Sequence, residues 1–210
     1  PQPVRVLAAN NGGTVGLSLA VAAEACEKAG KPGCEGFTYS DLKGMRVAWV
    51  KGAPALNVNN GAYLAYGGLT WDDVEKVEFG GFGDSWAGMI DGSVDAAFAS
   101  TNSGRAYEAA SGPRGVFWPP IDANNAEGIA RMQAIAPFFT PMIAKVGATI
   151  DDTDGVATAG YAYPVLMTYA VQDEGLTYNM TKAMNENFEQ FKGNAPGING
   201  WALDKQNFQW

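Results

Sequence analysis

Short apolar segments alternate with helical segments through the middle of this 210-residue sequence, and that alternation limits the fold more than any other feature. Runs of β-branched and apolar residues predict strands. The segments between them carry proline near the start or glycine at the end, which is typical of helices. Strands and helices that alternate at this spacing are joined by right-handed crossovers and form a mainly parallel sheet. The sequence therefore predicts an α/β fold.

The individual elements follow from the same signals. Predicted strands cover residues 4–9, 45–50, 77–79, 94–99, 115–118 and 164–170, and predicted helices cover 54–66, 84–90, 103–110, 124–135 and 176–192. Residues 15–23 fit a strand or a helix equally well, and the turn-rich residues 151–155 predict an exposed loop. In the last helix, one stripe at helical spacing is apolar, which is typical of a face packed in the core: Leu176, Met180, Ala183, Met184, Phe188 and Phe191.

Composition excludes several classes of function. The net charge of −8 argues against a nucleic-acid partner, because phosphate binding needs clustered Lys and Arg. The sequence has no histidine, which excludes Ser-His-Asp and Cys-His catalysis and zinc sites built on imidazole. It also lacks the glycine-rich fingerprints of dinucleotide and nucleoside triphosphate sites. We therefore expect no enzymatic activity, no catalytic residue, no metal site and no cofactor.

The two cysteines, Cys26 and Cys34, lie close together on either side of a polar, turn-rich stretch. A local disulfide between them would stabilise the fold by roughly 2.5 kcal/mol on the loop-entropy model. It would also indicate an oxidising compartment. The alternative is two free thiols, one of them packed on a hydrophobic face.

Two short loops of small or polar residues follow predicted strands. In a parallel α/β sheet, ligands bind at the carboxyl ends of strands, where helix N-termini present unpaired N–H groups and partial positive charge. Each loop alone is equally well explained as a cap of the next helix, but two loops after neighbouring strands favour a shared site for an anion such as a carboxylate. The candidate ligand-binding residues are Gly52, Ala53, Pro54, Ala55, Leu56 and Asn57 in the first loop, and Ser100, Thr101 and Asn102 in the second.

The segment DLKGMRVAWV at residues 41–50 resembles a segment of the type II periplasmic binding proteins. Residues 52–57, 67–74, 85–98 and 178–184 extend this resemblance to the TAXI branch of the receptors that serve TRAP transporters. DLKG alone is shared by many binding proteins, and its combination with GSVDAAF at 92–98 is more specific. The resemblance spans the chain, with the cysteine loop as an insertion.

This resemblance implies two α/β lobes that hold a small organic anion, a carboxylate or an amino acid, between them and deliver it to a membrane permease. It implies a periplasmic location. Lobe II would comprise residues 38–163, with parts of lobe I and the crossovers at 1–37 and 164–210. Ligand contacts map onto Gly52–Asn57 and Ser100–Asn102. Ala55 and Leu56 stand where the family often has hydroxyl residues, so contacts from the backbone are expected there.

Members of that family are longer, so we expect this chain to be a fragment, truncated at the N-terminus and slightly at the C-terminus. Its incomplete first lobe would leave apolar surface uncovered, which predicts dimerisation or strand exchange. A ligand-sensing effector domain of a cytoplasmic regulator is the alternative, because such regulators use the same lobed fold. A disulfide between the two cysteines would argue against that alternative.

Overall fold

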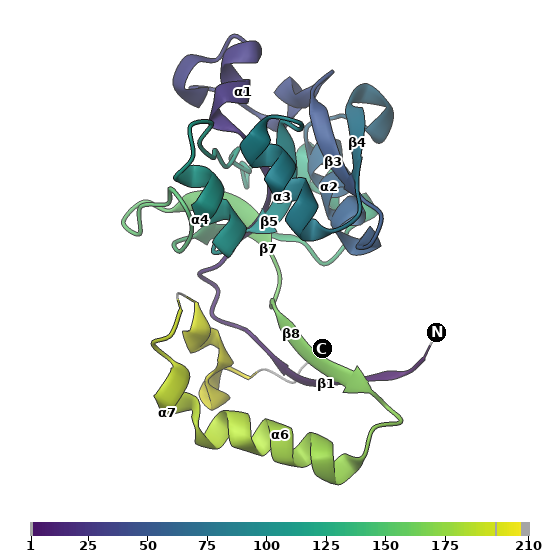
Figure 1. Ribbon diagram of the computed structural model, residues 1–210, viewed down its shortest axis with the longest axis vertical. Helices are drawn as coiled ribbons and strands as arrows, with labels where there is room; N and C mark the ends of the chain where they lie inside the picture. Colours follow the sequence, from purple (N-terminus) through teal and green to yellow (C-terminus); the bar gives the residue numbers. More distant parts are fainter. Residues whose placement is uncertain (1, 196, 207–210) are drawn as a thin grey trace. The chain divides into compact units, whose positions relative to one another are not determined.

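The structure is a computed structural model that describes residues 2–195 and 197–206. The chain forms two units: unit 1 comprises Pro1–Thr14 and Tyr161–Trp210, and unit 2 comprises Val15–Gly160 (Figure 1). The predicted lobe boundaries placed residues 15–37 with the two termini. In the structure these residues belong to unit 2. The reason is that the strand formed by residues 17–21 pairs inside the sheet of unit 2.

Unit 2 is built on one six-stranded sheet. Its strands, in order across the sheet, are β4 (Glu75–Phe79), β3 (Arg46–Val50), β5 (Ala96–Ser100), β2 (Leu17–Val21), β7 (Val156–Gly160) and β6 (Thr140–Ala144). β3 runs parallel to β4 and β5, whereas the pairs β5–β2, β2–β7 and β7–β6 are antiparallel. The predicted α/β class is confirmed, but the sheet is mixed and not mainly parallel, because β6 and β7 form a hairpin and β2 enters the sheet in the opposite direction to β5.

Five α-helices belong to the described part of unit 2: α1 (Ala23–Lys28), α2 (Pro54–Tyr66), α3 (Phe82–Asp91), α4 (Gly104–Ala110) and α5 (Ala126–Ile135). Short 3-10 turns lie at Pro32–Cys34, Tyr39–Leu42 and Trp71–Asp73. The two turns at Tyr39 and Trp71 begin with capping boxes made by Thr38 with Asp41 and Thr70 with Asp73. The core of the unit lies around the sheet and includes fully buried Trp86, Tyr39, Tyr63, Leu19 and Met132.

Two predictions for unit 2 change in the structure. The ambiguous residues 15–23 contain strand β2, which is buried along its whole length. The predicted strand at 115–118 is reduced to one isolated bridge between Phe117 and Val21. The predicted exposed loop at 151–155 is confirmed, since it forms the turn that links β6 to β7.

Unit 1 has much less secondary structure. Strands β1 (Val4–Ala9) and β8 (Val165–Tyr169) pair antiparallel as a two-stranded sheet. Helices α6 (Glu174–Glu186) and α7 (Phe188–Phe191) and 3-10 turns at Ile198–Trp201 and Leu203–Lys205 complete it. The helix predicted at 176–192 is therefore interrupted at Asn187.

The predicted core role of the apolar stripe on that helix is wrong in this chain. No residue of α6 is buried, and Leu176 and Met180 are 54% and 49% exposed. A two-stranded sheet is too small to cover the apolar face of a thirteen-residue helix.

Candidate functional site

The carboxyl ends of β3 and β5 meet at one edge of the sheet in unit 2. The two strands are parallel neighbours, so the two predicted ligand loops that follow them lie at the same edge. From β3 the chain passes through α2 to β4, which is the neighbour of β3 on one side. It then passes through α3 to β5, which is the neighbour of β3 on the other side. Right-handed crossovers in opposite directions place α2 and α3 on opposite faces of the sheet (Figure 1). This arrangement is a topological switch point, where open α/β sheets bind ligands.

The first loop makes a close backbone turn at this edge. Gly52 donates its N–H to the Gly80 carbonyl at 3.0 Å, and a Cβ at Gly52 would lie 2.5 Å from that oxygen, so only glycine fits. Ala53 donates its N–H to Val50 and Leu56 donates to Ala53. Pro54 has no N–H. In the first turn of α2, the N–H of Ala55 therefore remains without an acceptor among the described residues. Ala55 is exposed.

Asn57 serves the fold at this edge. Its side chain is buried, its Oδ1 accepts the Val50 N–H at 2.7 Å, and its Nδ2 donates to the Val50 carbonyl at 2.9 Å. The amide thus closes the end of β3 as a neighbouring strand would.

Thr101 fixes the second loop to neighbouring segments of unit 2. Thr101 is fully buried. Its Oγ1 donates to the Val146 carbonyl at 2.6 Å and accepts the Gly16 N–H at 3.1 Å. Ser100 and Asn102 are half-buried, on either side of Thr101.

Both connections between the units leave unit 2 from this same edge. Leu17 at the start of β2 pairs with Ser100 and with Ala159, and β7 ends at Gly160. The Thr101 N–H donates to the Gly16 carbonyl at 2.8 Å, which fixes the first connection beside the second ligand loop.

The helix termini at this edge are unusual in their electrostatics. Among the described α-helices, α2 and α4 alone have no acidic residue in the first turn, and neither has a side-chain cap. The other five each carry an Asp or Glu there: Glu24, Asp84, Glu127, Glu174 and Glu189. The partial positive charge of the thirteen-residue α2 is therefore not compensated by a carboxylate of its own.

Formal charges near this edge include Asp84 and Arg105, in the first turns of α3 and α4, and an exposed ion pair. Lys51 Nζ lies 2.6 Å from Glu78 Oε2, and both side chains are more than half exposed. A lysine with a carboxylate in an enclosed pocket would favour an enzyme, but this pair lies at the surface.

A buried charge network occupies the other end of β5. Asp95 Oδ1 contacts Arg46 Nη2 at 2.7 Å, Lys28 Nζ at 3.0 Å and Arg114 Nη2 at 3.3 Å. Burial alone raises the pKa of Asp95, but hydrogen bonds from Arg46 and Lys28 outweigh burial and lower the pKa to about 2. The network joins the first residue of β3 to α1 and to the loop before residue 115, so its role is structural.

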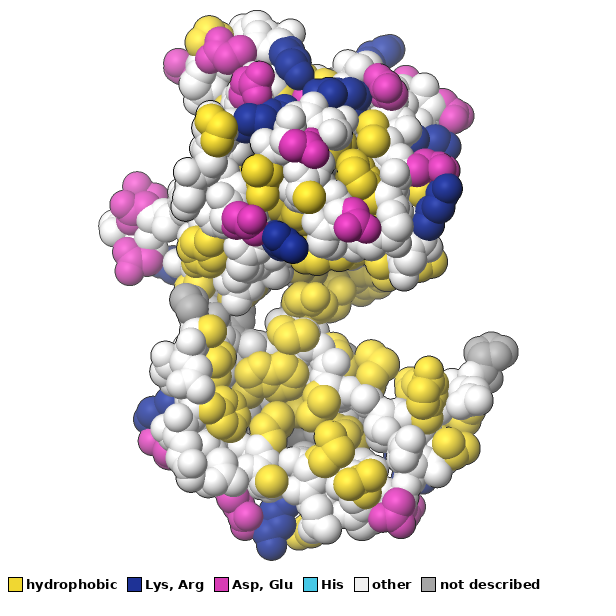
Figure 2. All heavy atoms as spheres, viewed as in Figure 1, with side chains coloured by type: hydrophobic (Ala, Val, Ile, Leu, Met, Phe, Trp, Pro, Cys, Tyr) yellow, Lys and Arg dark blue, Asp and Glu magenta, His cyan; other side chains and the backbone are white. Residues whose placement is uncertain are grey.

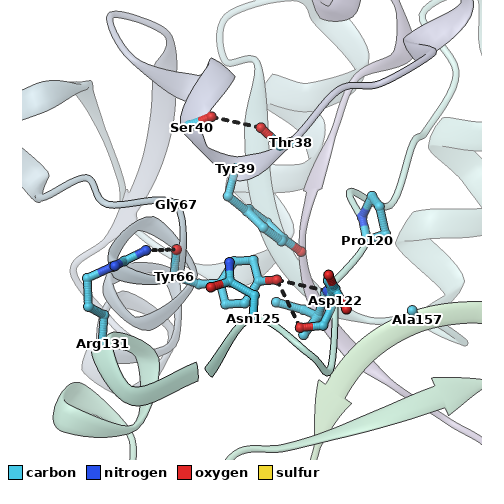
Figure 3. Close-up of a pocket in the computed structure, with 11 residues that line it drawn as sticks. Thr38, Tyr39, Ser40, Tyr66, Gly67, Pro120, Asp122, Asn125, Arg131 and Ala157 are labelled. Carbon is cyan, nitrogen blue, oxygen red and sulfur yellow. Dashed lines mark hydrogen bonds between the residues drawn. The ribbon is translucent and has the colours of Figure 1, made fainter. Parts of the chain in front are cut away.

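A cavity of about 440 Å³ lies at the opposite edge of the sheet, between the C-terminus of α2 and the loop before α5 (Figure 3). Several of its polar groups are already paired. Arg131 Nη2 donates to the Tyr66 carbonyl at 2.9 Å, and the Tyr66 hydroxyl accepts the Asp122 N–H at 2.8 Å. Sequence reasoning did not find this cavity, because it forms between segments far apart in the chain. Its partnered lining makes it a weaker candidate than the edge at β3 and β5.

In the described part of the chain, no group of three or more His, Cys, Asp or Glu residues could hold a metal ion. No helix in that part of the chain is both long and apolar enough to cross a membrane.

Similar structures occur among solved periplasmic and substrate-binding proteins. A periplasmic binding protein of an ABC transporter from Brucella ovis, with glutathione bound, has 13% sequence identity and a TM-score of 0.47 over 93% of this chain and 50% of that one. The second substrate-binding domain of GlnP from Lactococcus lactis, in an open conformation, has 12% identity and a TM-score of 0.36 over 94% and 60%. This chain thus spans about half to three fifths of their lengths.

No curated protein sequence matches this chain. The sequence profile of the NMT1-like family matches residues 20–207, which include all of the sheet of unit 2 except the first three residues of β2, and helices α6 and α7 of unit 1. This match covers most of the chain, and the protein therefore belongs to the NMT1-like family.

Proposed function

We propose that this protein is the solute-binding receptor of an uptake transporter and that it binds a small organic anion at the carboxyl edge of β3 and β5. The observation that carries the proposal is the N-terminus of α2. It lies at a topological switch point, it has an unpaired Ala55 amide, and it has neither an acidic residue nor a side-chain cap of its own.

A carboxylate suits this position better than a cation or a neutral group. Backbone N–H groups and the positive end of the helix dipole both favour negative charge. The hydroxyl of Ser100 and the side chain of Asn102 would give the ligand its orientation, while Asn57 and Thr101 hold the two loops in place. The ligand class is therefore an organic acid or an amino acid. The resemblance of residues 41–50 and 92–98 to receptors of TRAP transporters supports a transporter of that type, with this chain in its TAXI branch.

The disulfide supports an extracytoplasmic location. Cys26 and Cys34 are bonded in the structure, as the sequence predicts, with their Cα atoms 5.1 Å apart. Disulfides persist in oxidising compartments and are rare in the cytosol of mesophiles. The bond therefore favours a periplasmic receptor over the effector domain of a cytoplasmic regulator.

Calorimetric titration with amino acids and mono- and dicarboxylates tests the proposal. We expect at least one organic anion to bind. Ala55→Asp should weaken that binding at least about tenfold, because a carboxylate at the helix N-terminus repels the ligand. The same change should leave the fold intact, since an acid there stabilises the helix.

The matched control is Ala55→Asn, which has the same shape without the charge and should keep most of the affinity. If no anion binds, or if the Asp and Asn variants bind equally well, the proposed site is wrong.

A further inference from the structure

Strand β8 has an uncharged, exposed edge. Residues 165–171, Val-Leu-Met-Thr-Tyr-Ala-Val, contain no charge and no proline. Met167, Tyr169 and Val171 are 54%, 55% and 78% exposed. Figure 2 shows apolar side chains gathered over the part of the chain that carries β1, β8 and α6. Soluble proteins normally protect such an edge with charge, proline or a covering segment, because it pairs readily with another strand.

The hydrogen bonds of the β1–β8 pair show which backbone groups remain open. Ala170 donates its N–H to the Pro3 carbonyl at 2.8 Å, so residues 3 and 170 form a hydrogen-bonded pair. Bonded and non-bonded pairs alternate in an antiparallel ladder. The pairs Val4–Tyr169 and Val6–Met167 are then the non-bonded ones, and their N–H and C=O groups point away from the partner strand.

The outer edge of β8 therefore presents the backbone groups of Met167 and Tyr169. Among the described residues, no strand pairs with this edge, since β8 has β1 as its one neighbour in the sheet.

We propose that β8 of a second copy of this chain pairs antiparallel with this edge, around a two-fold axis at Thr168. The open backbone groups require odd-numbered residues of β8 to lie opposite odd-numbered ones, and the proposed register is the one centred on Thr168. Met167 bonds to Tyr169 of the second copy, and Thr168 lies opposite its own equivalent. Leu166 then lies opposite Ala170, and Val165 opposite Val171.

Every pair in this register is uncharged, and the sulfur of Met167 meets the aromatic ring of Tyr169. The edge is therefore complementary to itself, as a two-fold interface requires.

Charge decides between the two edges of this small sheet. The outer edge of β1 exposes the backbone of Val4 and Val6, and the symmetric register there that is equivalent to the one proposed for β8 is centred on Arg5. Two arginines would lie opposite each other, and like charges in that position destabilise a strand pair. Arg5 already pairs with Glu174 of its own chain at 3.4 Å. The β8 edge has no such conflict, and its pairing turns two marginal two-stranded sheets into one sheet of four strands.

Cross-linking tests the register directly. Directly opposed residues of a non-bonded pair have Cα atoms about 4.5 Å apart, within the range of a disulfide. Thr168→Cys should therefore give a covalent dimer under mild oxidation, and both natural cysteines are already bonded to each other. The matched control is Arg5→Cys on the β1 edge, which should remain monomeric on a non-reducing gel. The reverse pattern, or no cross-link from Thr168→Cys, overturns the proposal.

Sedimentation velocity over a concentration series tests the dimer without cysteine. The unmodified 210-residue chain should dimerise, and Thr168→Lys should weaken the dimer at least about tenfold, because two cations then lie on the axis. Thr168→Glu should weaken it likewise, and mixing the Lys and Glu variants should restore a dimer. A chain that is monomeric throughout, or a dimer that Thr168→Lys leaves unchanged, rules the interface out. These readouts involve no ligand, so they stand or fall separately from the proposed transport function.

Discussion

At the scale of single residues, Asp95 has the densest set of polar contacts in unit 2. Its side chain is 4% exposed, its Oδ2 accepts the Arg46 N–H at 3.2 Å and Nε at 3.0 Å, and its Oδ1 meets three cations. Arg114 also donates hydrogen bonds to the carbonyls of Met89 and Val94. One carboxylate thus fixes the start of β3, the start of β5 and the chain around residue 114.

The first prediction concerns the removal of that carboxylate. Asp95→Asn should lower the free energy of unfolding by about 3 kcal/mol at pH 7, because it leaves partly buried Arg46 without its ion-pair partner and leaves Arg114 with Glu24 alone. Urea unfolding followed by circular dichroism measures the change. Asp152→Asn in the exposed 151–155 turn is the control and should change nothing. Equal stability of the two variants would mean that the network contributes no net energy.

The second prediction concerns pH. The pKa of Asp95 falls from 3.8 to about 2 on folding, so the unfolded chain takes up the proton first as the pH drops. The stabilisation, about 2 kcal/mol, is complete above roughly pH 4.5 and is lost as the pH falls toward 2. Urea unfolding of the natural chain and of Asp95→Asn, at several pH values in this range, measures it. The difference between the two should shrink as the pH falls, and a constant difference would contradict the assigned pKa.

At the scale of elements, strong local signals predicted the sheet and helices around the site. The predicted helix at 54–66 is found at those residues, because Pro54 and Gly67 mark its ends. The predicted adjacency of the two candidate ligand loops is confirmed by the parallel pairing of β3 and β5.

Elements defined by long-range pairing were missed. β6 contains a proline and β7 is Val-Ala-Thr-Ala-Gly, so neither has an apolar strand pattern, and each becomes a strand through its neighbours. The roles of Asn57 and Thr101 escaped prediction for the same reason. Their hydrogen bonds to Val50 and Val146 depend on the folded position of those carbonyls and amides.

The third prediction belongs to the element that the disulfide closes, the end of α1 and the turn after it. Replacing both Cys26 and Cys34 by Ala should lower the free energy of unfolding by about 2.5 kcal/mol, because the unfolded chain gains the freedom of the short loop. Urea unfolding of the variant, and of the natural chain with and without reductant, measures it. As the control, adding reductant to the variant should leave its free energy of unfolding unchanged, because it has no disulfide. A natural chain equally stable in both redox states would show that the bond is not structural.

At the scale of the whole molecule, the two units differ in how much apolar surface they bury. Among the residues that the structure describes, all but two of the buried apolar ones lie in unit 2. In unit 1, β1, β8 and α6 expose Val4, Val6, Met167, Tyr169, Leu176, Tyr178 and Met180. Burial of apolar area is the main favourable term in folding, at roughly 25 cal/mol per Å². Stability should therefore be unequal along the chain, with the first and last segments the least stable.

The fourth prediction is that amide hydrogen exchange reports this inequality. Amides of β3, β5 and β2 should exchange only through global unfolding of unit 2, whereas those of β1, β8 and α6 should exchange much faster through local opening.

The experiment compares peptides from both units at low and high protein concentration. Protection at β8 should rise with concentration, because the proposed dimer covers the open groups of Met167 and Tyr169, while protection at β3 and β5 stays constant. Thr168→Lys should remove the concentration dependence and leave unit 2 unchanged. Equal protection of the two units would mean that the exposed apolar surface of unit 1 does not weaken it, and the physical basis for pairing at β8 would be lost.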